Sequence, residues 1–187
     1  MVNLILGVTG SVASIKLPVL LQSLRAAADN IEIKIIATTH SFHFFDQLSI
    51  DANIYNDDDE WQAWKQKGDP VLHIELRKWA DIMLIAPLDA NTLAKIANGI
   101  CDNLLTCLMR AWDLKRPVIF CPAMNTHMWK HPITSNHIAI LKNFGYIEVE
   151  PIEKRLACGD TGIGAMADIE KIVAVVMDIL SQLDTIR

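Results

Sequence analysis

The chain has 187 residues, of which 51% are hydrophobic and 21% are charged, and its formal net charge is -5. This length and composition predict one α/β domain with a substantial core, and the acidic balance argues against a protein whose main task is to hold nucleic acid phosphates. No apolar run is as long as the roughly 18 residues of a membrane span, and the spacing of the four cysteines is not typical of a zinc site. We therefore expect a cytoplasmic protein with free thiols.

The first half of the chain alternates buried strands with helices. Apolar runs predict strands over 2–8, 31–39 and 81–88. Helical patterns lie between them over 9–27, 40–48, 59–65 and 73–80. Pro18 falls inside the first of these patterns, where we expect it to kink the helix. The acidic run over 56–61 is interpreted as a solvated loop and helix start.

The second half repeats this alternation. Strands are predicted over 116–124 and 146–151, and helices over 89–99, 102–112, 125–129, 134–145 and 168–183. Asp89 or Asn91 can cap the first of these helices, and Gly99 can end it. The whole pattern predicts a three-layer α/β fold, with a doubly wound, mostly parallel sheet of the Rossmann-like or flavodoxin-like kind, in a single domain over 1–187.

Ligands of such sheets bind outside the carboxyl ends of the strands. The loops to search are therefore 7–12, 38–44, 86–92, 121–126 and the later loop 155–166.

Two of these loops can bind an anion at a helix start. Gly7, Gly10 and Ser11 can let a phosphate approach exposed amides, although a simple tight turn explains the same residues. Asn91 and Thr92 can add polar groups from the loop after the third strand, with helix capping alone as the alternative.

Further along the chain, three polar groups can carry chemistry. Asn125 can hold a carboxylate through its amide N–H, or it can simply cap a helix behind a core Met124. His73 suits proton transfer but can equally be structural. Cys158 can be a buried small side chain, although the glycines that follow it suit a loop that opens and closes. His127 and His131 lack a third ligand, so we predict no metal site.

Four separated motifs carry a resemblance to a known family: DPVLHIELRKWAD (69–81), APLDANTLAKIANGICDNLLT (86–106), PAMNTHMW (122–129) and KRLACGDTGIGAMA (154–167). Taken together they resemble the phosphopantothenoylcysteine decarboxylases, which belong to the FMN-dependent flavoproteins that decarboxylate C-terminal or pantothenoyl-linked cysteine. The resemblance runs from about residue 3 to 180, and the motifs occur in the family's order. Asp89 is a variable point, because some relatives carry serine there.

The resemblance implies a cofactor, a substrate and site residues. It places FMN against Gly10, Ser11, Val12, Thr39, Phe44, Asp89, Ala90, Asn91, Thr92 and Ala123. It implies substrate binding by Met124, Asn125, Arg155, Ala165 and Met166. It makes His73 an acid/base, Asn125 the binder of the substrate carboxylate, and Cys158 a proton donor on a mobile flap over about 154–167. Relatives form homotrimers whose active sites are shared between neighbouring chains, so His73 would face a flavin held largely by another subunit.

The implied reaction is the decarboxylation of 4'-phosphopantothenoylcysteine to 4'-phosphopantetheine in coenzyme A biosynthesis. The flavin would take a hydride from the carbon that bears sulfur, which gives a thioaldehyde. The carboxylate is then β to a C=S group and can leave as CO2. The enethiol that remains is re-reduced and protonated, so the overall reaction is redox-neutral.

Two rival functions stay open on the sequence. The first is another enzyme of the same fold, either a peptidyl-cysteine decarboxylase or a flavin prenyltransferase. The second is a flavin-binding regulatory subunit that acts on a phosphatase. His73 and Cys158 together favour an enzyme, although fold similarity does not fix function.

Overall fold

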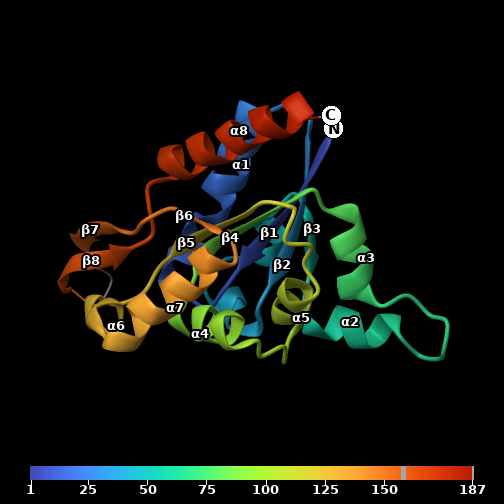
Figure 1. Ribbon diagram of the computed structural model, residues 1–187, viewed down its shortest axis with the longest axis horizontal. Helices are drawn as coiled ribbons and strands as arrows, with labels where there is room; N and C mark the ends of the chain where they lie inside the picture. Colours follow the sequence, from blue (N-terminus) through green and yellow to red (C-terminus); the bar gives the residue numbers. More distant parts are fainter. Residues whose placement is uncertain (157–158, 187) are drawn as a thin grey trace.

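The computed structural model describes residues 1–156 and 159–186. Its main sheet has six parallel strands in the order β3-β2-β1-β4-β5-β6, and helices cover both faces (Figure 1). These strands are β1 (Val2–Val8), β2 (Ile31–Ala37), β3 (Asn53–Tyr55), β4 (Ile82–Leu88), β5 (Val118–Pro122) and β6 (Ile147–Glu148). The predicted three-layer, doubly wound fold is therefore confirmed.

The helices divide between the two faces of the sheet. One face packs against α1 (Leu17–Ala27) and α8 (Ile169–Ile186). The other packs against α3 (Leu72–Trp79), α4 (Ala90–Asn98), α5 (Leu104–Arg110) and α7 (Pro132–Asn143). Shorter elements are α2 (Asp57–Ala63), α6 (Thr126–Lys130) and the 3₁₀ helices η1 (Val12–Lys16), η2 (Thr39–His43) and η3 (Gln47–Ser49). Among the described residues, no helix is both long and apolar enough to span a bilayer.

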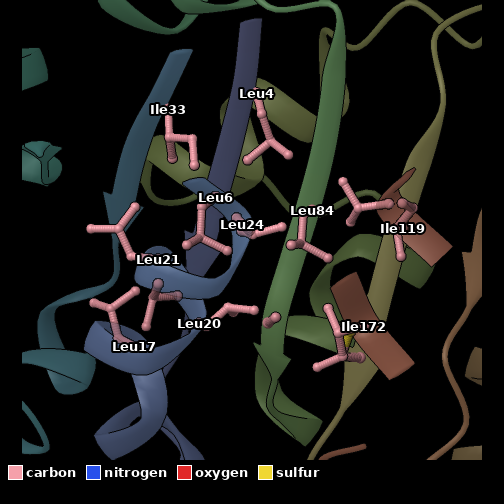
Figure 2. Packing of buried hydrophobic residues seen from close by; sticks show 14 of the residues in the cluster. Leu4, Leu6, Leu17, Leu20, Leu21, Leu24, Ile33, Leu84, Ile119 and Ile172 are labelled. Carbon is pink, nitrogen blue, oxygen red and sulfur yellow. The ribbon is translucent and has the colours of Figure 1, made fainter. Parts of the chain in front are cut away.

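Alternating side chains of the central strands fill both halves of the core. Leu4 and Leu84 point into the cluster under α1 and α8, whereas Ile5 and Met83 point into the cluster under the other helices. Figure 2 shows Leu4 and Leu84 in the first cluster together with Leu20 of α1. Because both faces are covered, each central strand is a continuous apolar run.

Leu84→Ala tests this packing. Leu84 has no exposed surface, so the variant should lose about 3 kcal/mol of unfolding free energy through lost burial and a cavity. Leu48→Ala is the matched control, because Leu48 is 95% exposed and its loss should change stability by less than about 0.5 kcal/mol. Urea denaturation measures both variants, and equal midpoints for the two would contradict the assignment of Leu84 to the core.

Pro18 does not kink a helix as predicted. The segment 9–27 forms η1 followed by α1, and Pro18 lies in the first turn of α1. Proline is tolerated there because the first amides of a helix lack an intrahelical acceptor. The helix start predicted over 40–48 is also wrong in type, since this segment forms η2 and η3.

The predicted loop over 155–166 is in part a β-hairpin. β7 (Ile152–Arg155) pairs antiparallel with β8 (Thr161–Ala165), apart from the main sheet. Neither strand follows an apolar alternation, and β8 contains two of the glycines that suggested a loop. In Figure 1 the hairpin lies beside α6, at the opposite end of the molecule from α2 and α3.

Candidate functional site

A cavity of about 570 Å³ opens at the carboxyl ends of β1, β4 and β5. The chain leaves β1 toward β2 on one side and β4 toward β5 on the other, and such a switch point is where ligands enter this fold. The cavity is walled by the loops after these three strands and by the β7–β8 hairpin. Its predicted site residues are Gly10, Ser11, Val12, Asp89, Ala90, Asn91, Ala123, Met124, Asn125, Arg155, Ala165 and Met166.

Thr9 fixes the first two loops to each other. Its buried hydroxyl donates to the Pro87 carbonyl at 2.8 Å and accepts the Asp89 amide at 2.8 Å. The Thr9 carbonyl in turn accepts the Ser14 hydroxyl at 2.7 Å. Thr9 was not among the predicted site residues, although a hydroxyl directly after a buried strand was the available signal. One buried side chain thus sets the spacing of the loops that carry Gly10 and Asp89.

Gly7 and Gly10 have different tasks. Gly7 lies inside β1, where a Cβ would come within 3.0 Å of Leu105 of α5, so it serves packing and not the predicted anion site. Gly10 lies at the cavity, where a Cβ would come within 3.0 Å of His40 and 3.4 Å of the Asp89 carboxylate. A side chain at Gly10 would therefore crowd η2 and the Asp89 carboxylate at the edge of the cavity.

Asp89 is both a helix cap and a charge at the cavity. Its Oδ1 accepts the Thr92 amide at 2.7 Å and so caps α4, which ends at Gly99 in a left-handed conformation with φ 71°. The loop after β4 can therefore both cap α4 and contact a ligand, so the two alternatives weighed from the sequence are compatible. Thr92 itself is buried and is not among the residues that line the described cavity.

Asp89→Ser should tighten FMN binding about fivefold at low salt, because serine keeps the cap while a negative charge beside the predicted phosphate site, worth about 1 kcal/mol, is removed. Titration of the flavin-free protein, followed by flavin fluorescence, measures this affinity at two salt concentrations. The gain should shrink at high salt. Riboflavin, which lacks the phosphate, is the control ligand, and an equal gain for riboflavin would contradict the electrostatic explanation.

The segment after β5 presents Asn125 in a fixed orientation. Its Oδ1 accepts the His127 amide at 2.8 Å and caps α6, so its Nδ2 is turned away from the helix and donates to Asp160 at 3.1 Å. The capping role thus orients the amide N–H groups that could hold a carboxylate. Met124 is mostly buried beside it and still reaches the cavity, as the prediction of a neighbour to the substrate requires.

The hairpin is docked on this segment through two glycines of β8. The Met124 amide donates to the Gly164 carbonyl at 2.9 Å. A Cβ at Gly164 would lie inside contact distance of the Met124 carbonyl, and one at Gly162 would lie 2.7 Å from the Thr126 methyl group. Only glycines allow the hairpin to approach so closely. Cys158, the predicted proton donor, lies outside the described residues.

Three cationic side chains line the cavity: Lys16, Lys154 and Arg155. Only Arg155 was predicted. Within the part of the chain that the structure describes, none of the three forms an ion pair with a carboxylate. These three positive charges outweigh the one negative charge of Asp89 in the cavity lining, so the cavity favours an anionic ligand. Lys16 was missed because it follows the glycine loop by one helical turn, where a basic residue gives no special signal.

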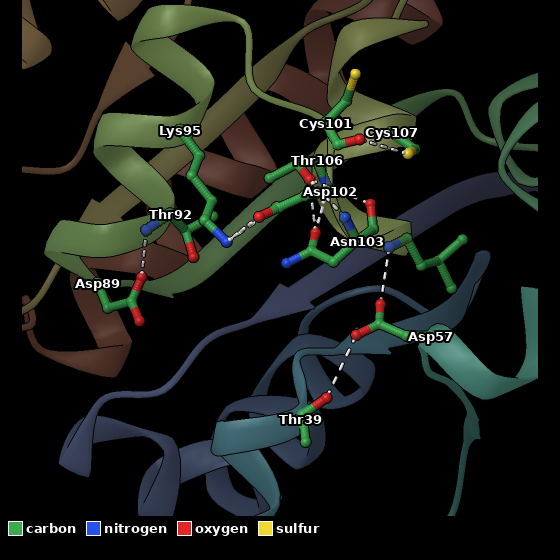
Figure 3. A network of polar contacts seen from close by, with 11 residues as sticks. Thr39, Asp57, Asp89, Thr92, Lys95, Cys101, Asp102, Asn103, Thr106 and Cys107 are labelled. Carbon is green, nitrogen blue, oxygen red and sulfur yellow. Dashed lines mark hydrogen bonds and ion pairs between the residues drawn. The ribbon is translucent and has the colours of Figure 1, made fainter.

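Three further predicted residues are not among those that line the described cavity: Thr39, Phe44 and His73. Thr39 begins η2, and its hydroxyl donates to Asp57 at 3.3 Å (Figure 3). Phe44 is half-buried at the end of η2 and packs edge-on against His43. η2 still adjoins the cavity, since His40 borders Gly10. The roles of Thr39 and Phe44 therefore stay predictions.

His73 lies on α3, away from the cavity of its own chain. Its Nδ1 is 2.5 Å from Oε1 of Glu60 on α2, and the two side chains are 23% and 14% exposed. The imidazole is therefore half-buried. Its partner Glu60 belongs to the acidic run over 56–61 that was predicted to be solvated.

Two cysteines outside the hairpin are poor nucleophiles. Burial raises the pKa of the Cys121 thiol in β5. Burial, helped by the charge of Glu60, raises the pKa of the Cys107 thiol to about 11. Because a thiol with a raised pKa holds little thiolate at neutral pH, neither group is activated. Among the described residues, no cluster of three His, Cys, Asp or Glu side chains could hold a metal ion.

A doubly wound sheet with a cavity at its switch point, lined by cationic side chains, defines an α/β protein that binds an anionic ligand such as a nucleotide-type cofactor. The family model described as Flavoprotein matches residues 1–181. The chain belongs to this flavoprotein family, and within it to the phosphopantothenoylcysteine decarboxylase group.

Individual relatives agree with this assignment. Mouse phosphopantothenoylcysteine decarboxylase is 54% identical over 99% of this chain and 90% of its own. A cysteine-to-serine variant of PPC decarboxylase complexed with pantothenoylaminoethenethiol superposes with a TM-score of 0.92 at 47% identity, covering 96% of this chain and 98% of that one. The FMN binding protein AtHal3 gives a TM-score of 0.88 at 48% identity, covering 96% of this chain and 97% of its own.

Proposed function

We propose that this chain catalyses the FMN-dependent decarboxylation of 4'-phosphopantothenoylcysteine to 4'-phosphopantetheine, a step of coenzyme A biosynthesis. The observation that carries the proposal is the cavity at the switch point, which joins three cationic side chains to the oriented amide of Asn125. The similarity to a decarboxylase from mouse over nearly the full length of both chains supports the substrate.

The cavity fits the flavin and a substrate by size and chemistry. Its volume of about 570 Å³ falls in the range typical of cofactor sites. Gly10 lies in the cavity lining without a side chain, and the loop around it would hold the phosphate with help from Lys16. Ala90 and Asn91 would contact the ribityl chain, and Ala123 would contact the ring. When bound, FMN supplies a reversible hydride acceptor for the carbon that bears the substrate's sulfur.

The chain's own residues bind, orient and protonate. Asn125 would donate from Nδ2 to the substrate carboxylate, which would take the place of the Asp160 carboxylate that Nδ2 contacts in this structure, while the cap on α6 holds the amide in orientation. Arg155, Ala165 and Met166 of the hairpin would close over the substrate. Cys158 would give a proton to the former α-carbon after CO2 has left, and His73 would move a proton during the oxidative half of the reaction.

We further propose a homotrimer in which His73 serves the cavity of a neighbouring subunit. α3, which carries His73, lies at one end of the molecule, and the hairpin lies at the other (Figure 1). Large apolar side chains are exposed in both regions, with Val12 and Ile15 at the cavity and Trp61 and Trp64 after Glu60. Burial of such side chains against a neighbouring subunit would support an interface at these regions. The cytoplasm is the proposed compartment, because the thiols of substrate and product stay reduced there.

The purified protein tests the function directly. It should be yellow, release FMN on denaturation, and convert 4'-phosphopantothenoylcysteine to CO2 and 4'-phosphopantetheine, as measured by mass spectrometry. A peptide that ends in cysteine is the control substrate and should stay intact. Turnover of the peptide alone would identify a peptidyl-cysteine decarboxylase, and equal turnover by flavin-free protein would exclude the proposed chemistry.

A further inference from the structure

Glu60 is a half-buried carboxylate whose contacts the proposed reaction does not yet use. Its Oε1 contacts His73 Nδ1 at 2.5 Å, and its Oε2 is buried without a hydrogen-bond partner among the described residues. A carboxylate with one buried, unpartnered oxygen is costly to keep. The Glu60 side chain is nevertheless only 14% exposed, and it lies beside the one histidine that the proposed reaction requires.

The helix that carries Glu60 is held rigidly. Asn56 caps α2 by accepting the Asp58 and Asp59 amides at 2.8 and 3.2 Å, and Asp59 returns a bond to the Asn56 amide at 2.8 Å. Asp57 accepts the Leu104 amide at the start of α5 at 2.8 Å (Figure 3). α2 therefore cannot rotate about its axis without breaking bonds at its first turn.

The other side of the pair is equally fixed. α3 packs on both α2 and α5, and buried Leu76 anchors it in the core one turn after His73. The charge of Glu60 also reaches Cys107 on α5, where it contributes to the raised pKa of that thiol. The carboxylate thus faces α3, where the imidazole meets it, and its charge extends to the neighbouring α5.

The chemistry of the pair determines which nitrogen of His73 is free. An ionised carboxylate can only accept hydrogen bonds, so Nδ1 must carry a hydrogen and donate it to Glu60. The second nitrogen, Nε2, is then the one that can exchange a proton with a ligand. A carboxylate that fixes the tautomer and the ring orientation of a catalytic histidine is a recurrent arrangement.

We propose that Glu60 is a positioning residue for the decarboxylation: it holds His73 with Nδ1–H toward α2 and presents Nε2 to the substrate. This inference rests on the proposed function only for its kinetic consequence, because the contact itself exists in the resting protein. Glu60 touches neither substrate nor cofactor and acts through His73.

Kinetics and ¹⁵N NMR of the histidine ring test the role in the FMN-loaded protein. Glu60→Ala should lower kcat by about 10- to 100-fold with KM within about twofold, as for other carboxylates that orient a histidine. Glu60→Gln should recover most of kcat, because its amide oxygen can still accept from Nδ1–H. In the wild type and in Glu60→Gln, Nδ1 of His73 should carry the proton. In Glu60→Ala the ring should lose this preference.

Asp58→Ala is the matched control, since it removes an exposed carboxylate from the same helix turn and should leave kcat and the ring signals unchanged. Wild-type kcat in Glu60→Ala, or an unchanged Nδ1–H signal, would overturn the positioning role. A wild-type protein that forms no product would instead reject the proposed function, and the ring signals would still report on the contact.

Discussion

Replacing His73 with asparagine is expected to abolish turnover and to leave the protein folded and yellow. Loss of a general acid/base should lower kcat by about 10²- to 10⁴-fold. The asparagine amide can still donate to Glu60, so the half-buried carboxylate keeps a partner and the melting temperature should hardly change. FMN content should also be unchanged, because the residues proposed to hold FMN are in the cavity lining and His73 would contribute proton transfer rather than cofactor binding.

A mixing experiment separates a shared active site from one within a single chain. His73→Asn and Asn125→Ala should each be inactive alone. If the sites lie between subunits, a co-expressed one-to-one mixture should regain about a quarter of wild-type activity, because about one interface in four combines an intact His73 with an intact Asn125. No recovery in mixed trimers would reject the shared site, and full activity of His73→Asn alone would make this histidine structural.

The strands could be predicted because burial on both faces leaves an unambiguous trace. Every residue of β4 is buried, which gives a continuous apolar run that no exposed element could carry. β3, by contrast, has three residues and is half-exposed, so it offers too few positions for a pattern. The hairpin was missed for another reason: Gly162 and Gly164 lower strand propensity, and their purpose appears only once Met124 and Thr126 lie beside them.

The location of the candidate site followed from the sequence, but its supporting contacts did not. Parallel strands end at one edge of a sheet, so loops after β1, β4 and β5 had to meet. Thr9 joins Pro87 and Asp89 across 78 and 80 residues, and no local pattern encodes such a bond. The acidic run was interpreted as solvated, which is wrong for Glu60. Asp58 and Trp61 beside it are exposed, and only the packing of α2 on α3 turns Glu60 toward His73.

Gly164→Ala is the variant with the largest expected effect on the hairpin. Gly164 has φ 148°, which is strained for alanine, and its new Cβ would collide with the Met124 carbonyl. Positive φ and overpacking each cost about 1 to 3 kcal/mol, and few contacts of the hairpin are available to offset them. The hairpin should therefore leave its place on the segment after β5, which would open the cavity and withdraw Arg155 from it.

Limited trypsin digestion measures this release, because Lys154 and Arg155 are exposed cleavage sites held in β7 by pairing with β8. Gly164→Ala should be cut there at least about tenfold faster than wild type, and its kcat should fall by a comparable factor.

Gly145→Ala is the matched control: Gly145 has φ 86° but open space around its Cβ, so the variant bears the backbone strain without the collision. It should lose about 1 kcal/mol of stability and keep its resistance to trypsin at the hairpin. If both variants resist trypsin equally and both stay active, the close approach of β8 to Met124 does not hold the hairpin. If only Gly164→Ala is cut and inactive, Gly164 is explained as the close contact that keeps the substrate side of the cavity closed.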